Sequence, residues 1–264
     1  MSQIPGGRTP FDDIYDRPDP REFFSVLGRF DYQTPHHAQP VFRRLVIERH
    51  RSRPVTVVDL CCSYGINAAL LNHHLTLADL YAHYTSPAVS ELDTAELIAH
   101  DKDFYAARRR DDAVPVVGLD IAASAIDYAL AVGLLDAGFT ENLETSTAST
   151  TLLRTVGEAG LITVTGGASF LTGRTFHQLL RAANEPMWVA AFVLRTGSYR
   201  PIADALAEYG LITEADPGHT VAQRRFTDLD EQRYALAAVT ATGADPSGKE
   251  TDGYYHTTLH LSRP

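Results

Sequence analysis

The sequence predicts an α/β fold in which a doubly wound sheet of mostly parallel strands carries helices on both faces. Apolar segments typical of buried strands alternate with segments of helical periodicity along most of the chain. In addition, an apolar strand, a turn of small residues and the start of a helix follow one another directly between Val55 and Leu71. A parallel sheet with a ligand site at its strand ends is therefore expected.

Length and charge limit the domain organisation and the kinds of partner that the chain can have. The chain has 264 residues, 44% of them hydrophobic, which suits one large α/β domain. Its formal net charge is -10, with 33 acidic and 23 basic residues. Affinity for nucleic acids depends on basic contacts to phosphates, so this balance argues against a nucleic-acid partner.

The cysteines and the N-terminal sequence indicate the cellular compartment in which the protein is expected. The two cysteines, Cys61 and Cys62, are adjacent and offer no disulfide framework, which predicts a reducing, cytoplasmic location. The sequence lacks a cationic start followed by an apolar run, and it lacks an apolar stretch of about 18 residues. We therefore expect neither a signal peptide nor a membrane span or membrane partner.

The first strand and the turn after it predict a site for a small charged ligand. The segment from Val55 to Leu60 is rich in β-branched residues, as expected of a strand buried on both faces. Helical spacing begins at Ile66, close to Gly65. The intervening turn leaves unpaired N–H groups at the helix N-terminus, where the helix dipole favours an anionic group.

A second strand, at 115–120, ends in an acidic residue. Ser124 and Asp127 then have the spacing of a capping box for the next helix. In doubly wound folds that bind nucleotides, a carboxylate at the end of the second strand accepts hydrogen bonds from ribose hydroxyls. Asp120 is expected to take this role.

Together these segments resemble the class I S-adenosylmethionine-dependent methyltransferases that act on small molecules. The first signature of that family is an apolar strand, Asp-Leu and a glycine-rich turn, which Asp59 and Leu60 begin and Gly65 ends. The second is an apolar strand ending in an acidic residue, matched by Val-Val-Gly-Leu-Asp-Ile at 116–121. The sequence departs from the family at 61–63, where Cys-Cys-Ser replaces the usual Gly-Cys-Gly.

The resemblance implies a Rossmann-like sheet of seven strands whose last strand, at 254–261, is antiparallel, and it implies S-adenosylmethionine as the cofactor. The residues implied to bind this cofactor are Asp59, Cys61, Cys62, Ser63, Tyr64, Gly65, Asp120, Ile121, Glu144 and Thr165. Normal affinity requires the Cys-Cys-Ser turn to keep the backbone of a glycine turn, although residues other than glycine tolerate positive φ poorly.

Residues 1–52 are expected to form a lid or cap ahead of a methyltransferase-like domain at 53–264. The part at 11–30 is too apolar to remain in solvent, so we expect it to pack against another part of the protein. Residues 31–40 hold two prolines and precede a helix expected at 41–51. The segment either folds over the cofactor or covers an edge of the sheet, and the sequence leaves both readings open.

Candidate catalytic residues lie in this N-terminal segment. If the methyl acceptor must lose a proton, a histidine with a pKa near the working pH can take it. We expect His36 and His37, together with Tyr32, to supply this chemistry, with His83 as a further candidate. A structural role remains open for each.

A helical insertion is expected between the first two strands. Asp59 and Asp120 lie 61 residues apart (120 minus 59), whereas a bare strand-helix-strand unit needs about 20 to 30. We place the insertion at about 80–113, with a helix that begins after Asp93 and runs to about Arg110.

Beyond Asp120 the alternation of strand and helix patterns continues. The expected elements are a helix at 124–135, a strand at about 139–144 that Glu144 ends, a strand at 161–165, a helix at 173–183 capped by Thr172, a strand at 187–194, a helix at 199–209, a strand at 220–226, a helix at 230–240 and the strand at 254–261.

No metal site is predicted. The sequence has no His-Glu-x-x-His or Cys-x-x-Cys spacing. His73 and His74 are consecutive on a helix, about 100° apart, so they cannot both bind one ion.

The leading hypothesis for function is methyl transfer from S-adenosylmethionine to an oxygen, nitrogen or carbon atom of a small-molecule acceptor, by a monomer or a homodimer. One alternative is a methyltransferase-like domain that binds cofactor or partner without methyl transfer. This alternative is suggested by the absence of the family's glycines at 61 and 63. Another is a nucleotide-dependent oxidoreductase. The absence of Gly-x-Gly-x-x-Gly after the first strand argues against that class.

Overall fold

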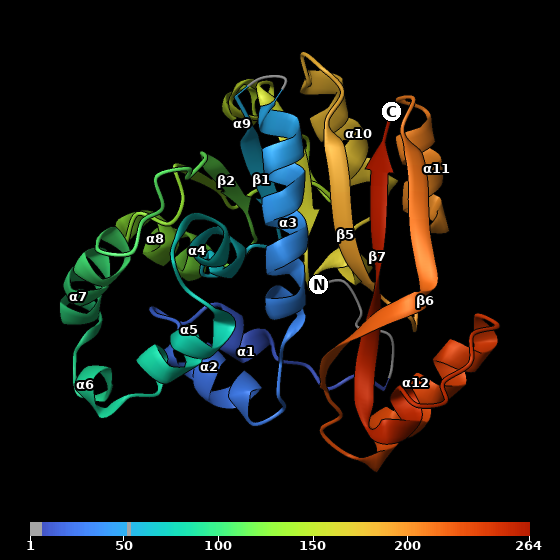
Figure 1. Cartoon of the computed structure of the whole chain (residues 1–264), viewed down its shortest axis with the longest axis horizontal. Coiled ribbons are helices and arrows are strands. Elements are labelled where there is room, and N and C mark those ends of the chain that lie inside the picture. The colour runs from blue at the N-terminus through green and yellow to red at the C-terminus, as the bar shows by residue number, and fades with distance from the viewer. Residues whose placement is uncertain (1–6, 52–53) are drawn as a thin grey trace.

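The computed structural model describes residues 7–51 and 54–264, which form a seven-stranded sheet with helices on both faces (Figure 1). The strands are β1 (Thr56–Leu60), β2 (Val116–Leu119), β3 (Ala137–Phe139), β4 (Ala159–Val164), β5 (Trp188–Leu194), β6 (Ile212–Arg225) and β7 (Tyr254–Arg263). The predicted domain boundary at 52–53 lies outside the described residues.

The strand order across the sheet is β3-β2-β1-β4-β5-β7-β6. β7 runs antiparallel to both of its neighbours, β5 and β6, and the other pairs are parallel. This confirms the predicted Rossmann-like sheet with an antiparallel last strand. The chain order reverses between β1 and β4, and open α/β sheets bind ligands beside the carboxyl ends of strands at such a switch point.

The helices cover both faces of the sheet. They are α1 (Asp12–Tyr15), α2 (Arg21–Gly28), α3 (Thr34–His50), α4 (Ile66–Asn72), α5 (Leu77–Tyr84), α6 (Pro87–Ser90), α7 (Thr94–Ala106), α8 (Ala123–Ala131), α9 (Thr150–Val156), α10 (Gly173–Ala182), α11 (Arg200–Ala207) and α12 (Leu229–Ala241), with 3₁₀ turns η1 (Ala168–Phe170) and η2 (Glu250–Asp252). Figure 1 shows α3 in front of the sheet and α10 and α11 behind it.

Neighbouring residues of β1 face opposite layers, because successive side chains of a strand point to opposite sides. Val57 belongs to the hydrophobic cluster that contains Phe42 of α3, whereas Val58 belongs to the cluster that contains Leu179 of α10. Since both faces are covered, the strand sequence is continuously apolar rather than alternating.

The N-terminal helices α1 and α2 are part of the main core. Ile14, Phe23 and Phe24 lie in the same hydrophobic cluster as Val57 of β1. The ring of Phe24 also stacks on Tyr84 of α5, with 4.7 Å between ring centroids. The segment expected to act as a lid or cap is therefore joined to the sheet and to the insertion by buried apolar contacts.

The expected insertion consists of α5, α6 and α7 and lies beside α2 (Figure 1). α7 begins after Asp93, as predicted, and a capping box fixes this start: the Asp93 carboxylate accepts from Glu96 N (2.9 Å), and the Glu96 carboxylate accepts from Asp93 N (3.0 Å). This helix ends at Ala106, slightly before the expected Arg110.

Two predicted boundaries are wrong. The helix expected at 41–51 begins at Thr34, so it includes both His36 and His37. Pro35 permits this start, because the first turn of a helix contains N–H groups that have no partner within the helix. β3 ends at Phe139, five residues before the predicted end at Glu144 (144 minus 139).

The N-terminus of α8 also differs from the prediction. α8 begins at Ala123, and no side chain caps it from the N-cap position, so Ser124 is not its cap. Instead, Asp120 accepts a hydrogen bond from Ala122 N (3.0 Å), and Asp16 accepts one from Ser124 N (2.8 Å). A residue more than a hundred positions away thus replaces the local cap.

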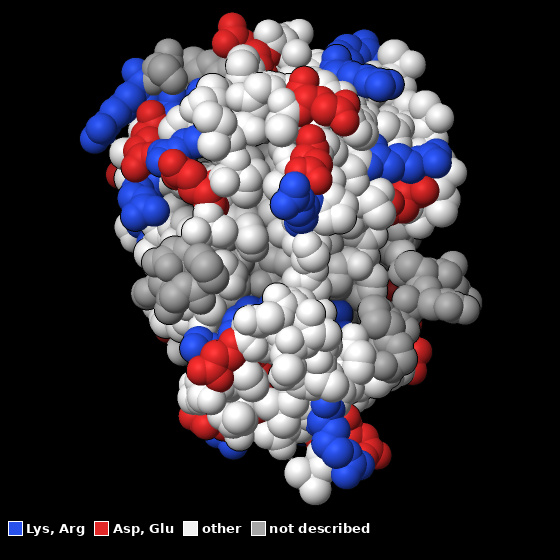
Figure 2. Space-filling model, turned by 90° about the vertical axis from the view of Figure 1, so that its right-hand side faces the viewer, with Lys and Arg blue, Asp and Glu red and all other residues white. Residues whose placement is uncertain are grey.

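None of the described helices combines the length and apolar character needed to cross a membrane. On the face of the molecule that includes β6 and α12, acidic and basic side chains lie interspersed (Figure 2). This pattern agrees with the mixed charge of the sequence.

Candidate functional site

The turn between β1 and α4 contains three residues in the left-handed region, at alternate positions. The φ angles are 54° for Cys61, 48° for Ser63 and 75° for Gly65. Cβ makes this conformation unfavourable in residues other than glycine, at a cost on the order of 1 to 3 kcal/mol each. Strain of this kind is frequent at functional sites.

Asp120 joins this turn to the end of β2. Its Oδ2 accepts a hydrogen bond from the backbone N–H of Ser63 (2.8 Å), and its Oδ1 accepts one from Ala122 N (3.0 Å). Burial raises the pKa of the Asp120 carboxyl above its usual range, although these N–H groups oppose the shift. Each carboxylate oxygen can accept a second hydrogen bond, so Asp120 keeps acceptor capacity for a ligand.

Two side chains beside Asp120 have features expected of a ligand site. The hydroxyl of Ser63 is buried and has no hydrogen-bond partner among the described residues. Buried polar atoms are usually paired, so an orphaned hydroxyl here is consistent with a missing ligand or water. Ile121 directly follows Asp120 and is 69% exposed, unusually high for a large apolar side chain at a strand end.

The two cysteines of the turn point in different directions. A Cβ atom built on Gly167, after β4, would lie 2.2 Å from Cys61 Sγ, so this thiol fills the space against Gly167. A Cβ atom on Gly118 of β2 would lie 2.7 Å from Cys62 Sγ, which places the second thiol against β2, in the main hydrophobic cluster. Burial raises the pKa of the Cys61 thiol, so it stays protonated.

Asp59, at the end of β1, is the centre of a buried polar group that links β1, α4 and β4. Its carboxylate accepts hydrogen bonds from Asn67 Nδ2 (2.9 Å) and Thr163 Oγ1 (2.7 Å). Asn67 also donates to Thr165 Oγ1 (3.0 Å). Burial raises the pKa of Asp59 to about 7, with its hydrogen bonds opposing the shift. Asp59 therefore connects the carboxyl ends of β1 and β4 to α4 through hydrogen bonds.

Tyr32 lies next to this polar group. A Cβ atom on Gly166 would lie 3.2 Å from the Tyr32 hydroxyl, which is also within hydrogen-bonding reach of Thr165. Burial raises the pKa of Tyr32 well above its usual value. Tyr32 therefore keeps its proton near neutral pH and can donate a hydrogen bond, but it is a poor base.

The two histidines proposed as bases lie on the first turn of α3. His36 is exposed, and the ring of His37 is 3.1 Å from Gln33 Oε1. Burial and the neighbouring His36 lower the pKa of His37. No hydrogen bond among the described residues connects either ring with Asp59 or Asp120.

Tyr64 holds the N-terminal segment over the turn. Its hydroxyl donates to backbone oxygens of Ile14 (3.1 Å) or Arg17 (3.0 Å) and accepts from Arg17 N (2.9 Å). Tyr15 lies in the same segment and is within electrostatic range of Asp120 and Cys61. The hydroxyl of Tyr64 thus anchors α1, and the predicted contact of Tyr64 with the cofactor stays a prediction.

Glu144 has a structural role as well. Its carboxylate accepts hydrogen bonds from the backbone N–H of Thr172 (2.9 Å), from the hydroxyl of Thr172 (2.7 Å) and from the hydroxyl of Thr175 (2.7 Å), at the N-terminus of α10. The prediction that placed Glu144 at the end of β3 failed because β3 is only three residues long.

One group of side chains was missed by sequence analysis. His83 of α5 and His100 and Asp101 of α7 lie together, with their ligand atoms all within 4.8 Å of one another. The two histidines are 17 positions apart (100 minus 83), on different helices, so no metal-binding spacing appears in the sequence.

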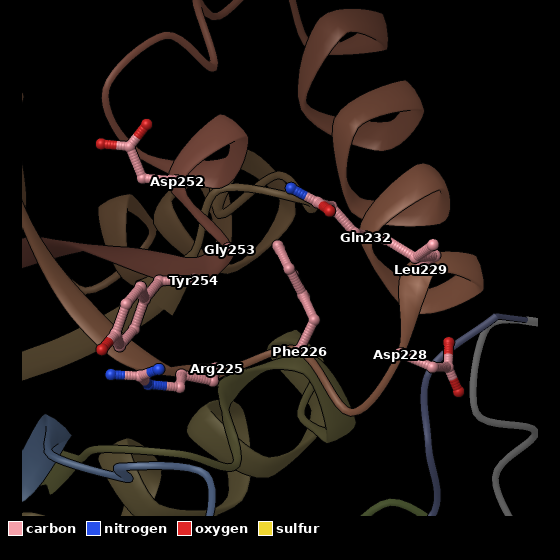
Figure 3. A pocket seen from close by; sticks show the side chains of 8 residues that line it. All are labelled: Arg225, Phe226, Asp228, Leu229, Gln232, Asp252, Gly253 and Tyr254. Carbon is pink, nitrogen blue, oxygen red and sulfur yellow. The ribbon is translucent and has the colours of Figure 1, made fainter.

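Two surface hollows are also present. One, of about 290 Å³, lies between the end of β6, the start of β7 and α12. Figure 3 shows Phe226 extending into it, with the guanidinium of Arg225 beside the ring of Tyr254. The other, of about 590 Å³, lies between α10 and α11. Neither is lined by a residue of the turn from Cys61 to Gly65.

The sheet has the Rossmann-like arrangement expected from the resemblance to the class I methyltransferases: seven strands, an antiparallel β7, and an acidic residue at the end of β2 that contacts the turn after β1. No protein-family model and no curated protein sequence matches the chain.

Several solved structures align with most of the chain. Magnesium protoporphyrin IX methyltransferase from Synechocystis PCC 6803, with bound S-adenosylmethionine, is 12% identical over 96% of this chain and 90% of that chain, with a TM-score of 0.44. The plantazolicin methyltransferase BamL is 12% identical over 88% of this chain and 85% of its own, with a TM-score of 0.45. The [4+2]-cyclase SpnF is 11% identical over 84% and 80%, with a TM-score of 0.42.

Proposed function

We propose that the protein binds S-adenosylmethionine at the carboxyl ends of β1 and β2 and transfers its methyl group to a small-molecule acceptor. The observation that carries this proposal is the backbone of the turn after β1. Residues 61, 63 and 65 are all left-handed. In the family that the sequence resembles, these positions are glycines, and here the conformation is kept although two of them are Cys and Ser.

The residues around the turn fit the cofactor. Asp120 retains acceptor capacity for the two hydroxyls of a ribose, and the adjacent Ile121 offers an exposed apolar surface for a base. The unpaired hydroxyl of Ser63 can bind a polar group of the ligand. When bound, the cofactor would supply a methyl group already activated by a sulfonium.

The protein's own contribution would be to align the reactants and exclude water. Tyr15, Phe23, Tyr32 and Tyr64 form a connected layer of aromatic rings, with centroids 5.5 to 6.2 Å apart, over the ends of the strands. Within it, Tyr32 would orient the acceptor by donating a hydrogen bond. The acceptor's reacting atom is an oxygen, nitrogen or carbon nucleophile.

The position of Cys61 favours a second candidate function, cofactor binding without methyl transfer. Its thiol fills the gap between the turn and Gly167, close to where the ends of β1 and β4 meet. A ligand that needs this gap must displace the side chain. In that case the site would hold S-adenosylmethionine or its product as a structural or regulatory ligand.

Calorimetry with S-adenosylmethionine, S-adenosylhomocysteine and NAD tests the binding step. We expect saturable binding of the first two at one site per chain and none of NAD. Binding of NAD alone would favour the oxidoreductase, and binding of none of the three would refute the proposal. Release of S-adenosylhomocysteine with a panel of phenols, amines and acidic carbon compounds then separates methyl transfer from binding alone.

A further inference from the structure

The helical insertion carries a second potential site, separate from the ligand turn. We call it the His–Asp cluster: His83 on α5, and His100 and Asp101 on α7. The ring nitrogen His83 Nε2 lies 2.7 Å from Asp101 Oδ1, and His100 Nδ1 lies 3.2 Å from the same oxygen. The two imidazole rings are stacked, with centroids 5.3 Å apart and planes 18° apart. Both rings thus present a nitrogen to one carboxylate oxygen.

These spacings are close to those of a metal site. Three ligands of a tetrahedral Zn²⁺, at about 2.0 to 2.2 Å from the ion, lie about 3.3 Å from one another. The ligand atoms of His100 and Asp101 already have this separation, those of His83 and Asp101 are about half an ångström closer, and all three ligand atoms lie within 4.8 Å of one another. Binding an ion requires the nitrogens of His83 and His100 to take up the same spacing from each other. Two imidazoles and one carboxylate are a common protein ligand set for zinc, with water as the fourth ligand.

A second layer of hydrogen bonds fixes the carboxylate. Asp101 is fully buried, and its other oxygen, Oδ2, accepts from the hydroxyls of Tyr84 (2.9 Å) and Tyr128. Tyr84 is further hydrogen-bonded to the Tyr105 hydroxyl (2.8 Å). These tyrosines leave Oδ1 directed at the two histidines. Outer hydrogen bonds of this kind orient the ligands of metal sites and strengthen metal binding.

The cluster is accessible from one side. The side chain of His100 is 43% exposed, whereas that of His83 is 8% exposed and is stacked on Phe104, with 3.9 Å between ring centroids. A metal ion could enter past His100, and a water molecule on that side could complete its coordination. The buried side is closed by the aromatic rings.

We propose that the His–Asp cluster binds one Zn²⁺ ion through His83 Nε2, His100 Nδ1 and Asp101 Oδ1. The ion joins α5 to α7 and so braces the insertion. Its effect reaches α2, because Tyr84 stacks on Phe24. The three proposed ligands lie outside the turn from Cys61 to Gly65, so zinc binding can be tested without any assumption about methyl transfer.

Titration of the chelator-treated, full-length protein with ZnCl₂, followed by calorimetry, tests the proposal without any activity assay. We expect one Zn²⁺ per chain and a rise in the melting temperature. Substitution with Co²⁺ should give the visible absorption of a four-coordinate site. His100→Ala, at a half-exposed position where the fold is expected to survive, should weaken binding by more than about 100-fold, since loss of an outer partner alone costs about 10- to 100-fold.

Two further variants make the result specific. His74→Ala removes an exposed histidine outside the cluster and should leave zinc binding unchanged. Tyr128→Phe removes one outer hydrogen bond and should weaken binding by about 10- to 100-fold while keeping all three ligands. If the wild-type protein shows no saturable binding, or if His100→Ala binds zinc as tightly as wild type, the cluster is only a hydrogen-bonded network and the proposal is wrong.

Discussion

The backbone N–H of Ser63 donates a 2.8 Å hydrogen bond to Oδ2 of Asp120, 57 residues later in the chain. This bond ties the turn after β1 to the carboxyl end of β2. Because Ser63 has positive φ, its N–H is directed by a strained backbone rather than by regular structure. The turn and Asp120 are therefore coupled, and we expect a substitution in one to change the conformation of the other.

Asp120→Ala tests the role of this unit in binding. It removes a charged acceptor, and each charge-assisted hydrogen bond contributes about 1.5 to 3 kcal/mol. We expect the Kd for S-adenosylmethionine, measured by calorimetry, to rise by more than about tenfold. Asp127→Ala, at an exposed position on α8, is the matched control and should not change the Kd. Unchanged affinity in a folded Asp120→Ala protein would refute the assignment.

Cys61→Gly should increase the affinity for S-adenosylmethionine. It relieves strain at a left-handed residue and clears the space against Gly167. Cys61→Ala separates these two effects, because it removes the thiol but keeps the Cβ atom and the strain. We expect the order of affinity to be Gly, then Ala, then Cys. A weaker Cys61→Gly variant would mean that the thiol itself helps to hold the ligand.

Tyr64→Phe should loosen the N-terminal segment. The change removes a buried hydroxyl and leaves backbone groups of Ile14 and Arg17 without their partner. We expect a loss of about 1 to 3 kcal/mol in the free energy of unfolding, measured with urea. Tyr209→Phe, whose hydroxyl bonds to His177 at a less buried position, should cost less. Equal losses would argue against a special anchoring role for Tyr64.

Asp59 should make the stability of the protein fall as the pH rises. Its folded pKa, about 7, is above the value of 3.8 for a free carboxyl, so the folded state holds this proton more tightly. The resulting stability is fully present below pH about 4 and is lost as the pH rises through about 7, by at most about 1.4 kcal/mol per pH unit. In Asp59→Asn the slope of unfolding free energy against pH should be smaller over this window. An identical slope would contradict the shift.

The His36→Ala/His37→Ala double variant should keep its activity. His36 is exposed and His37 is paired with Gln33, and neither is hydrogen-bonded to the residues around the turn. Once an acceptor is found, we expect kcat/KM to match the wild type from pH about 6 to 9. A selective loss of rate at low pH would instead restore these histidines as general bases.

Local sequence patterns determined the sheet and the position of the ligand turn. The continuous apolar runs of β1, β4 and β5 reflect burial on both faces, and the alternation in β7 reflects a half-buried strand. The helix starts after Asp93 and Thr172 could also be predicted from the sequence, because each cap bonds to a residue no more than three positions away. Burial and capping act over a few residues, so a single sequence reports them directly.

Tertiary structure alone decided how the site is closed and which side chains are free to act in it. Tyr64 binds Arg17 across 47 residues, Asp16 replaces Ser124 as the cap of α8 across 108, and His83 meets Asp101 across 18. Each of these polar contacts forms because a buried donor or acceptor must find a partner wherever the fold provides one. The positions of such polar partners do not recur at a fixed spacing along the chain, so the sequence does not reveal them. The apolar residues of a strand or helix do recur at a fixed spacing.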